Sequence, residues 1–159
     1  MSRIRLASLA FGSALVFGGL AQRADAAPLD AAVSAPIRAA LTAIDAGDAA
    51  AFARAFSPDA TIVDEISPFA FAGPDAARTW FARLLAVNRA NEIADEHGTF
   101  AAPHSGSIEG DAAYAVVPVR ISYRQRGRAF VENGAWTFVL RNARGTWKIT
   151  HAAFAAATS

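Results

Sequence analysis

The C-terminal part of the chain constrains the fold most strongly, because it holds three strand-like segments joined by two short turns. The segments cover residues 114–123, 130–140 and 147–154, and the turns cover 124–127 and 142–145. Strands that follow one another through short turns containing glycine pair as hairpins, so we expect an antiparallel meander. A further strand is expected over 99–104, and the lost alternation at 116–119 predicts a β-bulge near Pro118.

The middle segment, 130–140, is apolar on both of its faces. One face carries Phe130, Trp136, Phe138 and Leu140, and the other carries Val131, Ala135, Thr137 and Val139. A strand with one solvent-exposed face alternates apolar and polar residues. Because this segment is apolar on both sides, we expect both of its faces to be covered. Helices can cover only one of them. We therefore expect a homodimer through the sheet face with Trp136, Phe138 and Leu140, and a covering tail or loop is the alternative.

The first half of the chain predicts three helices with a strand after the second. The first helix should begin at Leu29 or Ser34 and end before Gly47, since apolar residues recur there at three- and four-residue spacing. A second short helix is expected after Asp48, a good N-cap residue. The Gly-Pro-Asp sequence at 73–75 opens a third helix. Helices first and strands last indicate an α+β fold.

Residues 1–26 have the features of a cleavable secretory signal. Arg3 and Arg5 form a positive start, residues 6–21 carry no charge, and Ala24-Asp25-Ala26 fits a signal peptidase site. An uncleaved membrane anchor is the alternative, but a span needs roughly 20 apolar residues and this run is shorter. We expect a signal over 1–26, one domain over 27–159, and a periplasmic or secreted protein with no membrane contact after cleavage.

The predicted mature domain is close to electrical neutrality. Removing residues 1–26 takes away three arginines and one aspartate, which changes the formal net charge from +1 to −1. This balance argues against nucleic acid or an anionic membrane as a partner. The chain has no cysteine, so an exported domain would hold itself together through its core.

Five short motifs occur along the predicted mature chain in an order that fits one known fold. They are Ala46-Gly47-Asp48, Phe56-Ser57-Pro58-Asp59-Ala60-Thr61, Gly73, Gly134-Ala135-Trp136-Thr137-Phe138-Val139 and Trp147-Lys148-Ile149-Thr150-His151. Together they resemble the nuclear transport factor 2-like superfamily, in its SnoaL-like and ketosteroid isomerase-like bacterial branch. The resemblance implies a cone, in which a curved antiparallel sheet wraps around three helices and leaves an apolar pocket.

Asp64 is the candidate catalytic residue, and the resemblance carries its assignment. The stretch from Asp59 to Asp64 is similar to the strand that holds the catalytic aspartate of ketosteroid isomerases. An aspartate in an apolar pocket has a raised pKa and can move a proton next to a carbonyl group. The alternative is an ordinary solvated acid at the end of a strand.

The oxyanion donors that a steroid isomerase needs are missing from the matching positions. Ala40 stands where the family has a tyrosine, and Thr137, a weak donor, stands where it has a protonated aspartate. We therefore expect no true steroid isomerase. Any enzymatic activity would be a proton transfer of isomerase, cyclase or lyase type, with Asp64 as general base.

The expected ligand pocket includes four aromatic residues besides Thr137 and His151. The aromatic residues are Trp80, Phe81, Tyr123 and Phe154, for which core packing is the alternative. His151 is expected to face either the pocket or the dimer surface, because a bulge would exchange the two faces.

The histidine spacing fits no metal site, and the sequence contains no cofactor fingerprint. We therefore expect no metal and no cofactor. The sequence predicts an exported protein whose pocket binds a small apolar or carbonyl-bearing molecule. An enzyme using Asp64 and a dimeric interaction module without catalysis are the two alternatives, and the fold does not choose between them.

Overall fold

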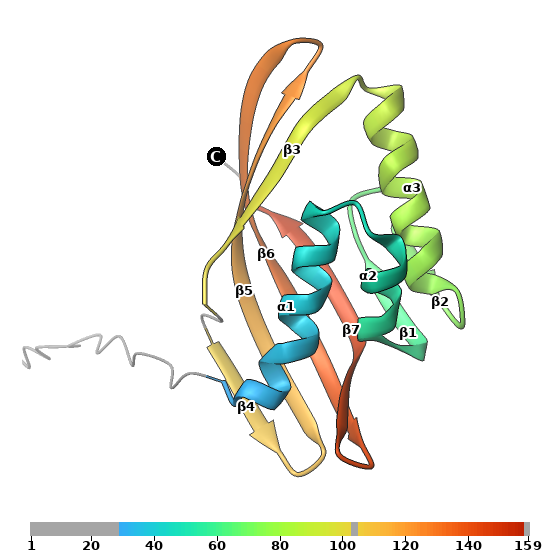
Figure 1. Ribbon diagram of the computed structural model, residues 1–159, viewed down its shortest axis with the longest axis vertical. Helices are drawn as coiled ribbons and strands as arrows, with labels where there is room; N and C mark the ends of the chain where they lie inside the picture. The colour runs from blue at the N-terminus through green and yellow to red at the C-terminus, as the bar shows by residue number, and fades with distance from the viewer. Residues whose placement is uncertain (1–28, 103–104, 158–159) are drawn as a thin grey trace, which may run out of the picture.

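The computed structural model describes residues 29–102 and 105–157, which form three helices and one seven-stranded sheet. The helices lie together on one side of the sheet, and the sheet curves around them without closing (Figure 1). This architecture confirms the predicted α+β fold. The predicted secretory signal, residues 1–26, lies outside the described residues. Among the helices of the described part, none is long and apolar enough to span a membrane.

The first two helices are capped by aspartate side chains. In α1 (Ala31–Asp45), Asp30 accepts a hydrogen bond from the Ala32 N–H at 2.7 Å. Ser34 therefore lies inside the helix, where its hydroxyl donates to the Asp30 carbonyl oxygen at 2.6 Å. In α2 (Ala49–Ala55), Asp48 accepts from the Ala51 N–H at 2.8 Å, which confirms the predicted cap. The third helix, α3 (Ala76–Ala90), follows Asp75.

The sheet has the strand order β2-β1-β7-β6-β5-β3, with β4 beside β5. The strands are β1 (Phe56–Val63), β2 (Ala70–Ala72), β3 (Ile93–Phe100), β4 (Ser105–Glu109), β5 (Ala112–Gln125), β6 (Arg128–Ala143) and β7 (Thr146–Ala156). The last three strands form the predicted antiparallel meander, whereas β1 and β7 pair in parallel.

The predicted bulge near Pro118 is wrong, because β5 pairs with β6 without a register shift from Ala112 to Gln125. The Pro118 carbonyl oxygen accepts from the Ala101 N–H at 3.1 Å, on the side of β5 away from β6. On that side, β4 pairs with β5 up to Val116 and β3 pairs with it from Val119. Proline is accommodated there because no ladder bond needs its missing N–H.

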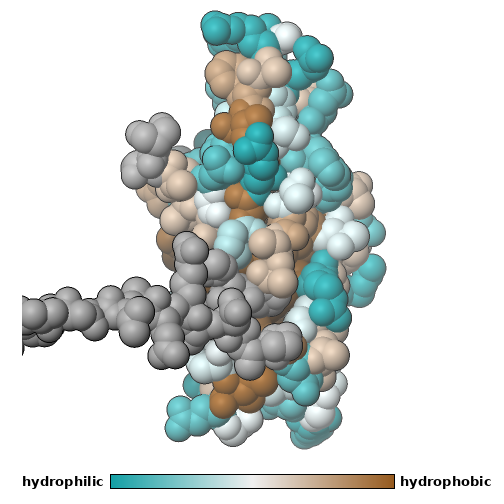
Figure 2. Space-filling view, turned by 90° about the vertical axis from the view of Figure 1, so that its left-hand side faces the viewer, coloured by the Kyte–Doolittle hydropathy of each residue, from teal (hydrophilic) through white to brown (hydrophobic). Residues whose placement is uncertain are grey.

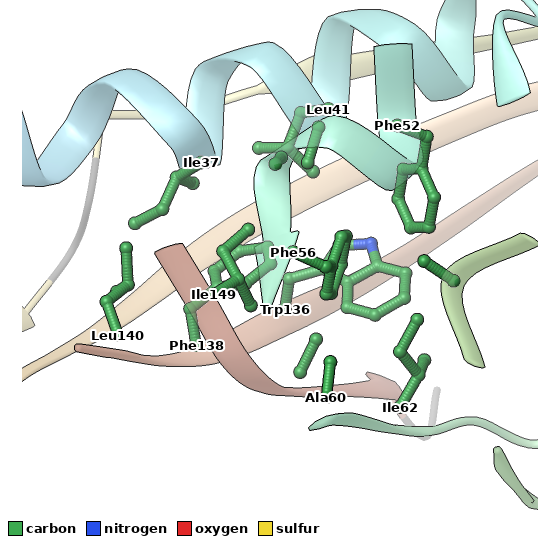
Figure 3. Close-up of a cluster of buried hydrophobic side chains, with 14 of the residues drawn as sticks. Ile37, Leu41, Phe52, Phe56, Ala60, Ile62, Trp136, Phe138, Leu140 and Ile149 are labelled. Carbon is green, nitrogen blue, oxygen red and sulfur yellow. The ribbon is translucent and has the colours of Figure 1, made fainter. Parts of the chain in front are cut away.

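The face of β6 with the bulky side chains belongs to the core. It is therefore not the dimer surface that the sequence led us to expect. Trp136, Phe138 and Leu140 are 5%, 2% and 0% exposed and pack beneath the helices. Figure 3 shows these side chains pointing from the sheet toward Ile37, Leu41 and Phe52 of the first two helices. The reason is size, since large rings fill the space between a curved sheet and helices that small side chains would leave empty.

The other face of β6 is the uncovered one. Val131, Ala135, Thr137 and Val139 point away from the helices, and Val131 is 50% exposed. Both faces are thus apolar, as the sequence indicated, but the available face carries the smaller residues.

Candidate functional site

A cavity of about 350 Å³ lies between α3 and the strands β3, β5 and β6. Its wall is built from two kinds of side chain, aromatic and aliphatic residues on one hand and carboxylates on the other. The aromatic members are Trp80, Phe81, Phe100, Tyr123, Trp136 and Phe154. Trp80, Trp136 and Phe154 pack in a continuous chain that also includes Phe52 of the core. Trp80 stacks on Phe52 at 4.9 Å and meets Trp136 edge-on at 5.6 Å, and Trp136 packs on Phe154 at 5.4 Å between ring centroids.

Asp64 lies in the wall of this cavity, immediately after the end of β1. It is only 6% exposed. Its Oδ1 accepts a hydrogen bond from the Ile66 N–H at 2.9 Å, and its Oδ2 accepts from the Trp80 indole Nε1 at 3.0 Å. Its backbone N–H donates to the Phe69 carbonyl oxygen at 3.0 Å, which closes the loop between β1 and β2. The carboxyl group is therefore held in one orientation from two directions.

Burial raises the pKa of Asp64 above its usual value. The hydrogen bonds from Ile66 and Trp80 act the other way, because they stabilise the ionised carboxylate, but burial is the larger effect. A carboxyl group with a raised pKa binds a proton closer to neutral pH than a solvated aspartate does. Each oxygen also keeps a second lone pair, so a ligand proton can still reach it.

Four further carboxylates line the same cavity: Asp45, Glu65, Glu96 and Glu132. Glu96 accepts a hydrogen bond from the Asn88 amide nitrogen at 2.6 Å. Burial raises the pKa of Glu96, and the carboxylate of Asp45 adds to the effect. Burial is also the main cause of the raised pKa of Glu132, followed by the charges of Glu65, Glu96 and Asp64. These acids therefore sense one another across the cavity.

The residues predicted for the ligand pocket separate into two groups. Trp80, Phe81, Tyr123 and Phe154 all lie in the cavity wall together with Asp64.

Thr137 and His151 are not among the residues that line the cavity, so these two pocket assignments are wrong. Thr137 alternates with the inward-facing Trp136 and Phe138 and therefore points to the outer face. His151 pairs with Val139, also on the outer face, and is exposed. The register of β7 against β6 shifts between Val139 and Leu140. This shift interrupts the alternation along β7 and turns the His151 side chain to the outer face of the sheet.

Sequence reasoning missed the three glutamates of the wall. Glu132 could have been found, because it has the same parity on β6 as the core residues Trp136 and Phe138. Glu96 gave no such signal, since Asp95 adopts a positive φ of 54° and the register of β3 shifts between Ala94 and His97.

The donors expected of a steroid isomerase are not supplied by Ala40 or Thr137. Ala40 is buried in the core at 1% exposure, and Thr137 faces away from the cavity. The polar wall residues with a hydrogen to donate include Tyr123 and Asn88. Burial is the largest cause of the raised pKa of Tyr123, and the charge of Glu132 adds to it, so its hydroxyl keeps its proton.

Within residues 29–102 and 105–157, no cluster of three histidine or carboxylate side chains could hold a metal ion. His97 instead lies beside Asp45, with its Nδ1 2.8 Å from the Asp45 Oδ1.

The model of the SnoaL-like domain family matches residues 25–153 of this chain. No curated protein sequence matches this chain. The fold is similar to that of a ketosteroid isomerase-like protein from Erwinia carotovora atroseptica, with a TM-score of 0.65 and 18% identity, over 81% of this chain and 96% of the other.

Two further solved structures have the same fold. The hexachlorocyclohexane dehydrochlorinase LinA type 2 superposes with a TM-score of 0.69 and 14% identity, over 80% of this chain and 84% of the other. A proposed scytalone dehydratase from Novosphingobium aromaticivorans gives a TM-score of 0.64 and 12% identity, over 80% and 83% of the two chains. At these identities the similarity concerns the fold alone.

We predict that Trp80→Phe raises the pKa of Asp64 further, because the variant loses the indole donor that stabilises the ionised carboxylate. Its free energy of unfolding should fall by about 1–3 kcal/mol where Asp64 is ionised, the usual cost for a hydrogen bond to a charged group. The loss should shrink as the pH falls and Asp64 takes up its proton. The measurements are the pH titration of the Asp64 carboxyl carbon by NMR and urea unfolding at several pH values.

Trp136→Phe is the matched control. It shortens a neighbouring ring of the same cluster without removing the donor to Asp64. An unchanged Asp64 titration in Trp80→Phe, or an equal change in both variants, would show that the hydrogen bond does not set this pKa.

Proposed function

Because this chain belongs to the SnoaL-like domain family, as its sequence motifs indicated, we propose that its cavity binds a small, largely apolar molecule that contacts Asp64. The observation that carries this proposal is a buried carboxyl group in the wall of an otherwise mainly aromatic and aliphatic cavity. Ligand sites are typically concave and apolar, with a few fixed polar groups and volumes of roughly 300–1,000 Å³. The cavity of about 350 Å³ lies at the lower end of that range.

We further propose that Asp64 exchanges a proton with the bound molecule. Three features support this role: the carboxyl group is buried, it is fixed by Ile66 and Trp80, and burial raises its pKa. A general base works best when its pKa lies near the working pH, so the raised value favours proton transfer. A dehydrochlorinase and a proposed dehydratase share this fold, and an elimination of that kind also requires removal of a proton. The reaction would be of isomerase or lyase type.

We predict that the protein binds acetophenone, a small neutral ketone, and catalyses exchange of its methyl protons with deuterium in heavy water. In Asp64→Asn this exchange should fall by about 10²–10⁴-fold, the usual contribution of a positioned general base. Proton NMR measures both the binding, by titration, and the exchange rate.

Asp59→Asn is the control, because Asp59 is an exposed acid on β1, the strand that ends just before Asp64. Exchange that persists in Asp64→Asn would remove Asp64 from the chemistry while leaving the binding proposal intact. Failure of acetophenone to bind, together with a ligand-free mass of the gently purified protein in native mass spectrometry, would count against the binding proposal itself.

We propose that a second copy of this chain covers the outer face of the sheet. The centre of this face carries uncharged residues from four strands: Val63, Val116, Pro118, Ala135, Thr137, Val139 and Ala153. In Figure 2 hydrophilic residues gather at the two ends and along the right-hand edge of the side view, and apolar and pale residues lie between them. An uncharged and partly apolar face of this kind is typical of an interface between identical subunits.

Val139→Glu should convert such a dimer into a monomer, because it places a charge at the centre of the face. Ile108→Glu is the control, since Ile108 is an exposed apolar residue on the opposite side of the sheet. Sedimentation equilibrium over a range of concentrations gives the mass. A wild-type monomer at the highest concentration, or a dimer that survives Val139→Glu, would contradict the proposal.

We also propose that the protein is exported, with cleavage after Ala26. The family match begins at residue 25, which supports a boundary between signal and domain at this point. In a Gram-negative host, the full chain should reach the periplasm with Ala27 as its first residue. Val16→Arg, which places a charge in the apolar run, should keep the uncleaved chain in the cytoplasm. An uncleaved wild-type chain in the cytoplasmic fraction, identified by N-terminal sequencing, would overturn this proposal.

A further inference from the structure

The charges around the cavity all have one sign. Its lining residues include the five carboxylates of Asp45, Asp64, Glu65, Glu96 and Glu132, and none of the lining residues is a lysine, arginine or histidine. The chain as a whole carries nearly equal numbers of basic and acidic residues, 15 and 14. The negative wall is therefore a property of this cavity and does not follow from the overall composition.

One wall carboxylate has a basic neighbour, because the His97 Nδ1 lies 2.8 Å from the Asp45 Oδ1. Two arginines on β5 and the following turn pair with acids outside the wall. Arg124 pairs with Asp95 at 3.5 Å and Arg126 pairs with Glu92 at 3.9 Å, all of them exposed residues that do not line the cavity. Across the described part of the chain, no basic side chain lies within ion-pair distance of Glu65, Glu96 or Glu132.

These acids repel one another, and a positive charge between them would relieve the repulsion. The charges of Glu65, Glu96 and Asp64 contribute to the raised pKa of Glu132, after burial. The charges of Glu132, Glu65 and Glu96 also contribute to the raised pKa of the Tyr123 hydroxyl, and again burial is the larger cause. An anionic ligand would add to this repulsion, and a neutral ligand would leave it unchanged. Among charged ligands, the carboxylates of the wall therefore attract cations and repel anions.

The aromatic part of the wall favours the same class of ligand. The faces of tryptophan and tyrosine rings attract cations, most strongly in a site sheltered from water. Trp80, Trp136 and Tyr123 lie in the wall with the carboxylates. A ligand with an ammonium group and a small apolar body therefore matches both parts of the wall, the carboxylates through its charge and the rings through its body.

We propose that the natural ligand of this cavity is a small organic amine that binds as its protonated form, with an aromatic or aliphatic body. The ammonium group lies among Glu65, Glu96 and Glu132, and the body packs on the rings of the wall. This inference rests on the proposed function as a small-molecule site, and it narrows the ligand from apolar molecules in general to amines. Glu96 is already positioned for this contact by its hydrogen bond from Asn88.

The test compares three probes that share one skeleton, namely 2-phenylethylamine, 2-phenylethanol and 3-phenylpropanoate, in calorimetric and NMR titrations of the full mature chain. At neutral pH the amine should bind at least about tenfold more tightly than the alcohol, and the carboxylate should bind most weakly. Glu96→Gln and Glu132→Gln, which keep the shape and remove the charge, should each weaken the amine severalfold and leave the affinity for the alcohol unchanged. Glu109→Gln, an exposed residue at the end of β4, is the control.

The outcomes separate this inference from the proposal on which it rests. If the alcohol binds as tightly as the amine, or if both glutamine variants bind the amine like the wild type, the amine proposal is overturned and the small-molecule site stands. Tightest binding of 3-phenylpropanoate also overturns it. If none of the three probes binds and acetophenone does not bind either, the binding site itself is refuted, and the amine proposal with it.

Discussion

The hydrogen bond between the Trp80 indole and Asp64 connects the core to the candidate site. Trp80 is held by its stacking on Phe52 and by its edge contact with Trp136, so its Nε1 has a defined position. The carboxyl group takes its orientation from that position and from the Ile66 N–H. Packing of the aromatic core therefore decides where the acid of the cavity points, and a change in the core reaches the site without touching Asp64.

The acidic cavity carries a cost in stability that is consistent with a functional role. Asp64, Glu96 and Glu132 all have raised pKa values, so the unfolded chain releases their protons more readily than the folded one. The free energy of unfolding therefore falls as the pH rises from the ordinary carboxyl range, about 4, through the raised values of the folded protein. Apolar residues at these positions would avoid that loss. Perturbed carboxyl groups gathered in one cavity are a physical signature of a binding or catalytic site.

The sequence predicted the three helices and the C-terminal meander, because helix caps and hairpin turns are local signals. It did not predict β2 or β4, and the strand expected over 99–104 was wrong, since β3 covers Ile93–Phe100. It indicated that both faces of β6 are apolar, but the face that meets the helices follows from side-chain volume in three dimensions, and we assigned it incorrectly. The position of His151 depends on a register shift beside Val139, and that of Glu96 on the positive φ of Asp95. Alternation cannot reveal such local irregularities. Glu132 follows simple alternation with Trp136 and was predictable.

An amine in this cavity would also change the chemistry that Asp64 can perform. A nearby ammonium group favours the ionised carboxylate and so lowers the pKa of Asp64 from its raised value. The ligand would therefore bring the residue into the form that accepts a proton, at the expense of some of its basicity. When the cavity is empty or holds a neutral ligand, a larger fraction of Asp64 stays protonated. Under these two proposals the protonation state of Asp64 would depend on the ligand in the cavity, which would link recognition of the ligand to the proposed proton transfer.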